Sequence, residues 1–232
     1  MVYENNTNGI AQEARIAVVG VGGAGCNVVS DIYNALCSVD TIAINTDKEA
    51  LHNTSADSKI YICKEVLKGE GARGDVTLGK KCADIHREEI RQAVSGYDFV
   101  FVIAGLGGGT GTGAASVVIE AAQSQGIMTF AIAIAPFSFE GSKVEKAKAG
   151  FAQISSICSQ STLVLNDRVF DKMKTLNFNL GMKEVNKSIL KYIVESTNIL
   201  ESIYEDELDK PRNESSKKIP EAMFSLEQLM SA

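Results

Sequence analysis

The chain has 232 residues, a formal net charge of −6 at pH 7 and a hydrophobic fraction of 45%. This composition is ordinary for a globular protein with a buried core, and the negative charge excludes a general attraction to nucleic acid or anionic lipid. The five cysteines are scattered and never in C-x-x-C spacing, which predicts reduced thiols and no zinc site. No apolar run approaches the roughly 20 residues of a membrane-spanning helix. Because the cysteine pattern predicts reduced thiols, we expect a cytoplasmic protein. Residues 1–14 are polar, and we expect them to form a flexible N-terminal extension.

The first fifty residues alternate apolar strands with a glycine-rich turn. Residues 15–19 predict a buried strand that runs into Gly20-Val21-Gly22-Gly23-Ala24-Gly25, a G-x-G-x-x-G loop that opens a helix through about Leu36. Thr41–Ile44 predicts a second strand, which ends in Asn45-Thr46-Asp47. Taken alone, this start fits a Rossmann dinucleotide site with an acidic residue about 20 positions further on. It does not separate a nicotinamide dehydrogenase from a GTP-binding protein.

The next stretch combines a strand, a loop and a helix. Lys59–Ile62 predicts a third strand, and residues 68–75 form a loop that contains three glycines. That loop is also consistent with an ordinary surface turn. From about Asp75 to Val94 the pattern predicts one helix whose charged face lies in solvent.

Residues 105–113 are the richest glycine cluster, with glycine at six of nine positions. Residues 98–104 before them are a nearly continuous apolar run of strand length, and residues 114–122 after them predict a helix. A strand, a glycine loop and a helix start together favour phosphate binding, because glycine lets backbone N–H groups converge on an anion. Thr110 and Thr112 add hydroxyls for helix capping or for phosphate oxygens. A flexible glycine linker would lack the buried flanks.

The segment GLGGGTGTGAA at residues 105–115 resembles the signature of the tubulin/FtsZ family, and of its FtsZ branch most. The triplet NTD at 45–47, PFSFEG at 136–141 and LNDR at 165–168 are similar to further motifs of that family. The resemblance covers roughly residues 15–200. It implies an α/β fold, namely a Rossmann-like nucleotide-binding domain with a mostly parallel sheet and helices on both faces. It also implies GTP or GDP as the ligand, with Mg²⁺ accompanying GTP.

The resemblance also assigns roles to particular residues. The loop at 69–74 is similar to the family loop that senses the γ-phosphate, and Glu140 matches the glutamate that meets the ribose. The family usually has an arginine four residues after that glutamate, where this chain has Val144 with Lys143 beside it. The residues expected to bind the nucleotide are Gly22, Gly23, Ala24, Asn27, Asn45, Asp47, Gly71, Ala72, Gly107, Gly108, Gly109, Thr110, Gly111, Thr112, Pro136, Glu140, Asn166 and Asn186.

Asn166 and Asn186 are assigned from segments outside the glycine loops. Asn166, in the segment Asn166-Asp167-Arg168, also fits a plain helix cap. Asn186 lies on a long amphipathic helix predicted from about Leu180 to Tyr204, and it is the nearest match to the family residue that reads guanine. We expect no protein-only metal site, because Asp47 and Glu70 would hold Mg²⁺ through water. We also expect no catalytic base within the chain.

The C-terminal part of the sequence departs from the family pattern. FtsZ proteins continue past the long helix with an N-x-D-x-x-D loop and a second domain, which this sequence does not contain. We therefore expect a GTP-binding domain at residues 15–205 and an acidic linker with a short amphipathic tail at residues 206–232. The tail segment 219–230 is either a partner-binding peptide or a segment that docks on its own domain.

Three functions follow from this pattern. The first is a guanine-nucleotide-binding cytoskeletal regulator with slow intrinsic hydrolysis, acting on a full-length FtsZ-type homologue or on itself, and the resemblance suggests cell division as the process. The second is a GTPase activated in trans by a partner that supplies the missing loop. The third is an NAD(P)-dependent Rossmann oxidoreductase, which the second glycine cluster and the PFSFEG loop disfavour.

Overall fold

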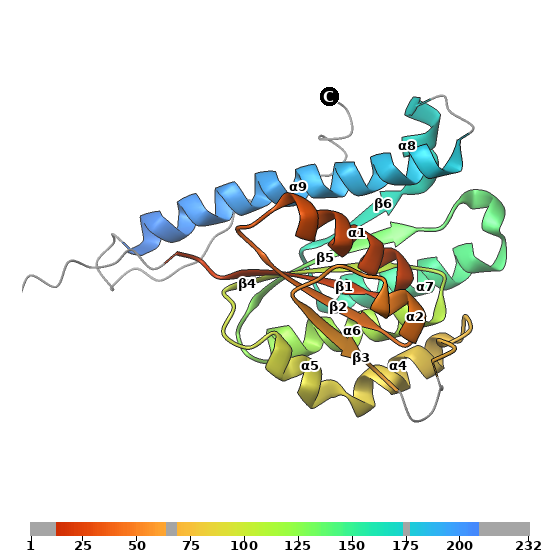
Figure 1. Cartoon of the computed structure of the whole chain (residues 1–232), viewed down its shortest axis with the longest axis horizontal. Coiled ribbons are helices and arrows are strands. Elements are labelled where there is room, and N and C mark those ends of the chain that lie inside the picture. The colour runs from red at the N-terminus through yellow and green to blue at the C-terminus, as the bar shows by residue number, and fades with distance from the viewer. Residues whose placement is uncertain (1–12, 64–68, 174–176, 209–232) are drawn as a thin grey trace, which may run out of the picture.

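The computed structural model describes residues 13–63, 69–173 and 177–208, and these form three layers with helices on both faces of one sheet (Figure 1). Most of the expected N-terminal extension and of the linker and tail lies outside the described residues. The strands are β1 (Ile16–Val21), β2 (Asp40–Asn45), β3 (Ser58–Tyr61), β4 (Phe99–Gly105), β5 (Met128–Ala135) and β6 (Ser161–Leu165). The helices are α1 (Gly22–Ala35), α2 (Lys48–His52), α4 (Val76–Ile85), α5 (Arg87–Ala93), α6 (Gly109–Gln123), α7 (Ser142–Ile157), α8 (Asn166–Met173) and α9 (Phe178–Leu208), with a 3₁₀ turn at Ser138–Glu140.

The six strands form one sheet in the order β3-β2-β1-β4-β5-β6, and all five pairings between these strands are parallel. This confirms the predicted α/β class. Strands β2 and β3 extend the sheet on one side of β1, and β4, β5 and β6 then extend it on the other side. In such sheets ligands bind in the crevice at the carboxyl ends of the strands where the direction reverses. Val21 of β1 lies opposite Ala104 of β4, so the two glycine loops leave the sheet side by side.

Two apolar cores lie on opposite faces of the sheet, and successive residues of β1 contribute to them in turn. Ala17 and Val19 belong to the core under α4, α5, α6 and α7, whereas Ile16 and Val18 belong to the core under α1 and α9. All six residues of β1 are buried. Because helices cover both faces, the strands are nearly continuous apolar runs rather than alternating ones.

Helix α6 is buried around almost its whole circumference, and it packs on α4 by backbone contact. A Cβ on Gly113 of α6 would lie 2.2 Å from the carbonyl oxygen of Val76, and a Cβ on Gly79 of α4 would lie 2.2 Å from that of Gly109. Only glycine allows the two backbones to approach so closely. This contact holds the start of α6 in a fixed position at the edge of the sheet.

The single helix predicted from Asp75 to Val94 is wrong, because the chain breaks it at His86 into α4 and α5. The backbone of His86 has φ −98° and ψ 15°, outside helical geometry. Its ring Nε2 accepts a hydrogen bond from the backbone N–H of Cys63 at 2.9 Å, and its Nδ1 bonds Glu89 Oε2 at 2.8 Å. The apolar periodicity carries no sign of this contact with a residue more than twenty positions earlier.

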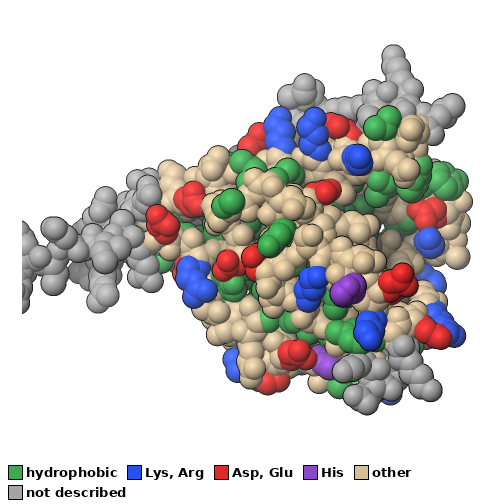
Figure 2. All heavy atoms as spheres, in the orientation of Figure 1, with side chains coloured by type: hydrophobic (Ala, Val, Ile, Leu, Met, Phe, Trp, Pro, Cys, Tyr) green, Lys and Arg blue, Asp and Glu red, His purple; other side chains and the backbone are tan. Residues whose placement is uncertain are grey.

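The long helix α9 is present as predicted and extends over 31 residues. It buries a stripe that includes Val185, Ile189 and Ile193 against α1 and the sheet, while Lys187 and Lys191 on its outer side are exposed. Figure 2 shows charged side chains along this outer edge. Among the residues that the structure describes, none of the helices has the length and apolar character needed to cross a bilayer.

Candidate functional site

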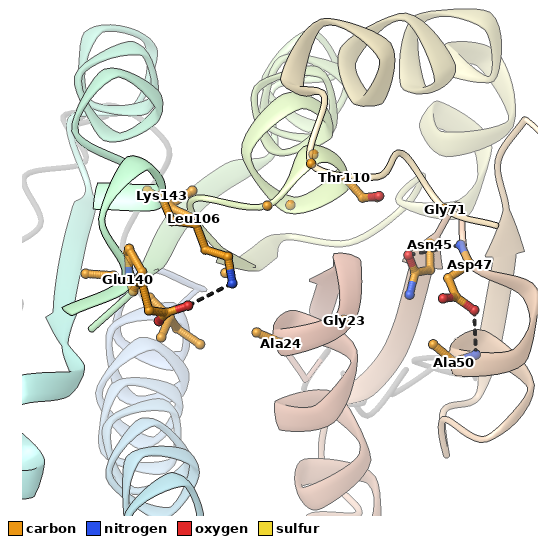
Figure 3. Close-up of a pocket in the computed structure, with 18 of the residues that line it drawn as sticks. Gly23, Ala24, Asn45, Asp47, Ala50, Gly71, Leu106, Thr110, Glu140 and Lys143 are labelled. Atoms are coloured by element: carbon orange, nitrogen blue, oxygen red, sulfur yellow. Dashed lines mark hydrogen bonds and ion pairs between the residues drawn. The ribbon is translucent and has the colours of Figure 1, made fainter. Parts of the chain in front are cut away.

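A cavity of about 420 Å³ opens at the carboxyl ends of β1, β2, β4, β5 and β6 (Figure 3). Its walls come from the start of α1, the segment after β2, the loop at 70–74, the start of α6, the segment after β5 and the start of α9. It brings together most of the predicted site residues, namely Gly23, Ala24, Asn45, Asp47, Gly71, Gly108, Gly109, Thr110, Gly111, Pro136, Glu140 and Asn166.

The two glycine loops lie directly against each other. Gly22 has φ +71°, and a Cβ at this position would lie 2.7 Å from the backbone nitrogen of Gly111. A Cβ on Gly105 would lie 2.5 Å from the Cβ of Ala24. The loops after β1 and β4 therefore share one wall of the cavity, as a common site requires.

The start of α6 presents backbone N–H groups to this cavity. Its N-cap residue is Gly108, which has no side chain to satisfy the first turn, and the preceding Gly107 has φ +95°. Thr112 Oγ1 accepts from the Gly107 N–H at 2.8 Å, and Thr110 Oγ1 bonds Thr46 Oγ1 at 2.6 Å, so both hydroxyls hold the loop together. The first turn of this 15-residue helix is thus available to an anion.

Two buried amides in the cavity wall each have a polar atom that nothing in the described chain pairs with. Asn45 is 2% exposed, and its Oδ1 accepts from the N–H groups of Thr46 and Asp47 at 2.8 and 3.3 Å, which leaves its Nδ2 unpaired. Asn166 is 5% exposed, and its Oδ1 is unpaired. Leaving such a group unsatisfied costs about 1–3 kcal/mol. Both atoms therefore indicate a polar ligand in the cavity.

The loop at 69–74 closes one side of the cavity. The backbones of Glu70 and Asp47 pair in an isolated antiparallel β-bridge. Asp47 Oδ1 caps α2 by accepting from the Ala50 N–H at 2.9 Å. Gly71 has φ +71° and faces Asp47. Ala72 of this loop is buried against the start of α6. A Cβ added to Gly109 would lie 2.8 Å from the Cβ of Ala72. This loop is thereby packed on the start of α6.

The segment after β5 closes the opposite side. Glu140 Oε1 accepts from the Phe137 N–H at 2.8 Å, and its Oε2 accepts from Lys143 Nζ at 2.8 Å. Burial acts to raise the pKa of Glu140, but these two hydrogen bonds outweigh it and lower that pKa. Glu140 is therefore an ionised hydrogen-bond acceptor at neutral pH.

The same side of the cavity has an aromatic wall that sequence reasoning missed. The ring of Phe137 lies 4.7 Å from that of Phe170 and 5.5 Å from that of Phe178, measured between centroids. Phe178 and Met182, both in the first turns of α9, line the cavity. Met182 belongs to the apolar stripe of the predicted long helix, and Phe178 lies two residues before the predicted start of that helix at about Leu180.

Several predicted residues lie outside the cavity lining. Four of them pack within or against the loops that form the cavity wall, namely Gly22, Ala72, Gly107 and Thr112. Asn27 is exposed on α1. Asn186, predicted to read guanine, donates from Nδ2 to Asp31 Oδ2 at 2.8 Å, one helical turn beyond Met182. Its role in base recognition stays a prediction.

The carboxylates that line the cavity are all engaged with other groups. Asp47 caps α2, Glu70 pairs with Arg73, and Glu140 pairs with Lys143. Within the described ranges, no three His, Cys, Asp or Glu side chains come together as a metal-binding group. The arrangement is thus suited to holding an anionic ligand by backbone N–H groups and a few polar side chains.

The sheet order and the two glycine loops at its switch point define a Rossmann-like α/β domain with a crevice at the carboxyl ends of its strands. The family described as "Tubulin/FtsZ family, GTPase domain" matches residues 15–174, and the chain belongs to this family. The chain is 37% identical over 182 residues to Cell division protein FtsZ 2 of Methanocaldococcus jannaschii, covering 78% of this chain and 48% of the relative. It is 36% identical over 190 residues to Cell division protein FtsZ 1 of Pyrococcus horikoshii, covering 81% and 51%.

Solved structures give the same result. The FtsZ dimer of M. jannaschii superimposes with a TM-score of 0.77 at 33% identity, over 82% of this chain and 56% of that one. CetZ1 from Haloferax volcanii, described as a GDP-bound monomer, superimposes with a TM-score of 0.70 at 26% identity, over 79% and 60%. This chain spans about half the length of the two FtsZ sequence relatives.

Proposed function

We propose that this chain binds GDP or GTP in the cavity between the two glycine loops. The observation that carries the proposal is the meeting of both loops at the start of α6, beside the unpaired Nδ2 of Asn45. Membership of the tubulin/FtsZ family and the GDP-bound state named for CetZ1 favour guanine nucleotides over NAD(P).

The chemistry of the cavity walls suggests how the nucleotide lies. The base fits the apolar end at Phe178 and Met182, where an aromatic ring can stack on it. The ribose hydroxyls then meet the ionised Glu140. The phosphates lie over the starts of α1 and α6, with the terminal phosphate toward the loop at 70–74. Mg²⁺ accompanies GTP near Asp47 and Glu70, held through water.

The proposal includes slow hydrolysis by the chain alone. Phosphoryl transfer to water needs a group that positions the attacking water. In the proposed complex, the three described carboxylates that line the cavity have other tasks: Asp47 and Glu70 hold the water shell of Mg²⁺, and Glu140 accepts from the ribose, so none is left to position the attacking water. A partner that contributes such a group would convert the chain into an active GTPase, which is the second candidate.

The cellular role within this proposal is that of a nucleotide-dependent cytoskeletal regulator or partner of a full-length FtsZ relative. Both sequence relatives are titled cell division proteins, and one matched structure is an FtsZ dimer. A contact through the nucleotide face, with such a relative or with a second copy, is the form of association that this role requires.

The first test is the identity of the bound nucleotide. We expect denaturation of the purified chain to release GDP or GTP, and we expect the emptied protein to rebind GDP but not NAD⁺. Chromatography of the released nucleotide and calorimetric titration measure both. Release of NAD(P), or failure to bind any guanine nucleotide, would contradict the proposal.

The second test concerns turnover. Phosphate release from GTP by the chain alone should be slow, and it should rise when a full-length FtsZ relative is added if activation in trans occurs. Co-sedimentation with filaments of that relative measures the regulatory role separately. Rapid turnover by the isolated chain would contradict the assignment of slow intrinsic hydrolysis.

A further inference from the structure

Two cations line the cavity within the described chain, and each is held by a glutamate three residues earlier. Arg73 pairs with Glu70, and Lys143 Nζ lies 2.8 Å from Glu140 Oε2. The side chains of Arg73 and Glu70 are 72% and 60% exposed, and those of Lys143 and Glu140 are 55% and 24% exposed, so both cations reach solvent. Exposed ion pairs contribute little to stability. Both cations can therefore be drawn away by a stronger anion.

The two cations flank the start of α6 on opposite sides. A Cβ on Gly107 would lie 2.9 Å from both the Cβ and the carbonyl oxygen of Lys143. On the other side, a Cβ on Gly109 would lie 2.8 Å from the backbone nitrogen of Asp75, which closes the loop that carries Arg73. Figure 3 shows Lys143 across the cavity from Gly71, with Gly23 between them. The backbones that carry the cations are thus fixed relative to the phosphate-binding loop.

The backbone of Arg73 is itself unusual, since its φ of +46° lies in the left-handed region that costs free energy for a residue with a Cβ. The loop is also tied to α7, because Lys146 Nζ donates to the carbonyl oxygen of Gly74 at 2.8 Å. The surroundings therefore hold an arginine at the cavity edge in a conformation that glycine would adopt more readily.

We propose that Arg73 and Lys143 form a two-cation clamp that exchanges its glutamates for the phosphates of the bound nucleotide. The clamp rests on the proposed guanine-nucleotide binding. Lys143 lies beside Glu140 and the aromatic wall, so it meets the phosphate nearest the sugar. Arg73 lies at the opposite end, beyond Gly71, so it meets the terminal phosphate. Hydrogen bonds from a cation to phosphate are among the stronger ones in proteins, and Arg can form two at once.

The exchange has a consequence for the two glutamates. When Lys143 moves to a phosphate, Glu140 is left free to accept from the ribose hydroxyls. When Arg73 moves, Glu70 is left free to hold the water shell of Mg²⁺. Cation and carboxylate on each side therefore change partners together, which couples phosphate binding to ribose and metal binding.

The test compares guanosine, GMP, GDP and GTP on the wild-type chain, Arg73→Gln and Lys143→Gln. Lys143→Gln should weaken GMP, GDP and GTP by about tenfold each and should not weaken guanosine, because guanosine has no phosphate for Lys143 to contact. Arg73→Gln should weaken GTP by about tenfold and leave GMP unchanged. Calorimetry or fluorescence titration at fixed salt gives the affinities, and thermal unfolding without nucleotide checks that each variant folds.

Matched controls exist on α5 and α7. Arg91 pairs with Glu88 and Lys148 pairs with Glu145 at the same three-residue spacing, and neither lines the cavity. Arg91→Gln and Lys148→Gln should bind all four ligands as the wild type does. The charge-conserving variants Arg73→Lys and Lys143→Arg should retain most of the affinity, which keeps the test decisive if a glutamine variant folds poorly.

The outcomes separate the clamp from the proposed function. Wild-type affinity for GTP in folded Arg73→Gln and Lys143→Gln would overturn the clamp and leave nucleotide binding standing. Equal losses for guanosine and GTP would also overturn it, because a phosphate contact cannot affect guanosine. A wild-type chain that binds none of the four ligands would overturn the proposed function and the clamp with it.

Discussion

Gly113→Ala is expected to lower the free energy of unfolding by about 3 kcal/mol, although alanine is the better helix former. The added Cβ would lie 2.2 Å from the carbonyl oxygen of Val76 and 2.5 Å from the backbone nitrogen of Lys80. Both atoms belong to the backbone, so rotation of a side chain cannot relieve the contact. Helix α4 would have to move away from α6. Urea unfolding followed by circular dichroism measures the change.

The control for this prediction is another helical glycine. Gly23 lies in the first turn of α1, and apart from its chain neighbours and the backbone of its own helix no described atom lies within 4 Å of the Cβ that alanine would add. Gly23→Ala should therefore unfold at the same urea concentration as the wild type or a higher one. Equal midpoints for Gly113→Ala and the wild type would show that α4 and α6 have room to separate, and the account of their packing would be wrong.

The strands and the fold class could be predicted from the sequence, because strands that are covered by helices on both faces of the sheet consist of long apolar runs. Residues 98–104 illustrate this, since the run coincides with β4 to within one residue. The break between α4 and α5 could not be predicted. It depends on the ring of His86 reaching the backbone of Cys63 at the end of another element, and helical periodicity does not record such a contact.

The candidate site divides in the same way. The two glycine loops that form the cavity wall could be predicted, because glycines between a buried strand and a helix start let backbone N–H groups converge on an anion. The side chains from α9 could not, because a helix advances about 5.4 Å per turn and its placement against α1 decides which turn faces the cavity. Here the first turns, with Phe178 and Met182, face the cavity, whereas Asn186 lies a turn further along, on Asp31. The aromatic wall follows from packing rather than from any local motif.

Gly23→Ala is expected to weaken binding of GDP and GTP by about tenfold to a hundredfold while leaving the fold intact. Gly23 lines the cavity at the start of α1 and is exposed there, so the new methyl group would point into open space rather than into protein. In the proposed complex that space belongs to the phosphates, which must approach the backbone closely to reach its N–H groups.

The prediction is checked by titrating GDP into the wild type and Gly23→Ala, each first shown to unfold normally. A matched variant is Gly126→Ala, a glycine in the turn after α6 whose Cβ would meet no atom within 4 Å beyond its chain neighbours, and which does not line the cavity. Its φ of +75° costs some stability on substitution, yet its affinity for GDP should equal that of the wild type. If Gly23→Ala binds GDP as tightly as the wild type does, the phosphates do not lie against the start of α1, because a methyl group at that position cannot share the space with them.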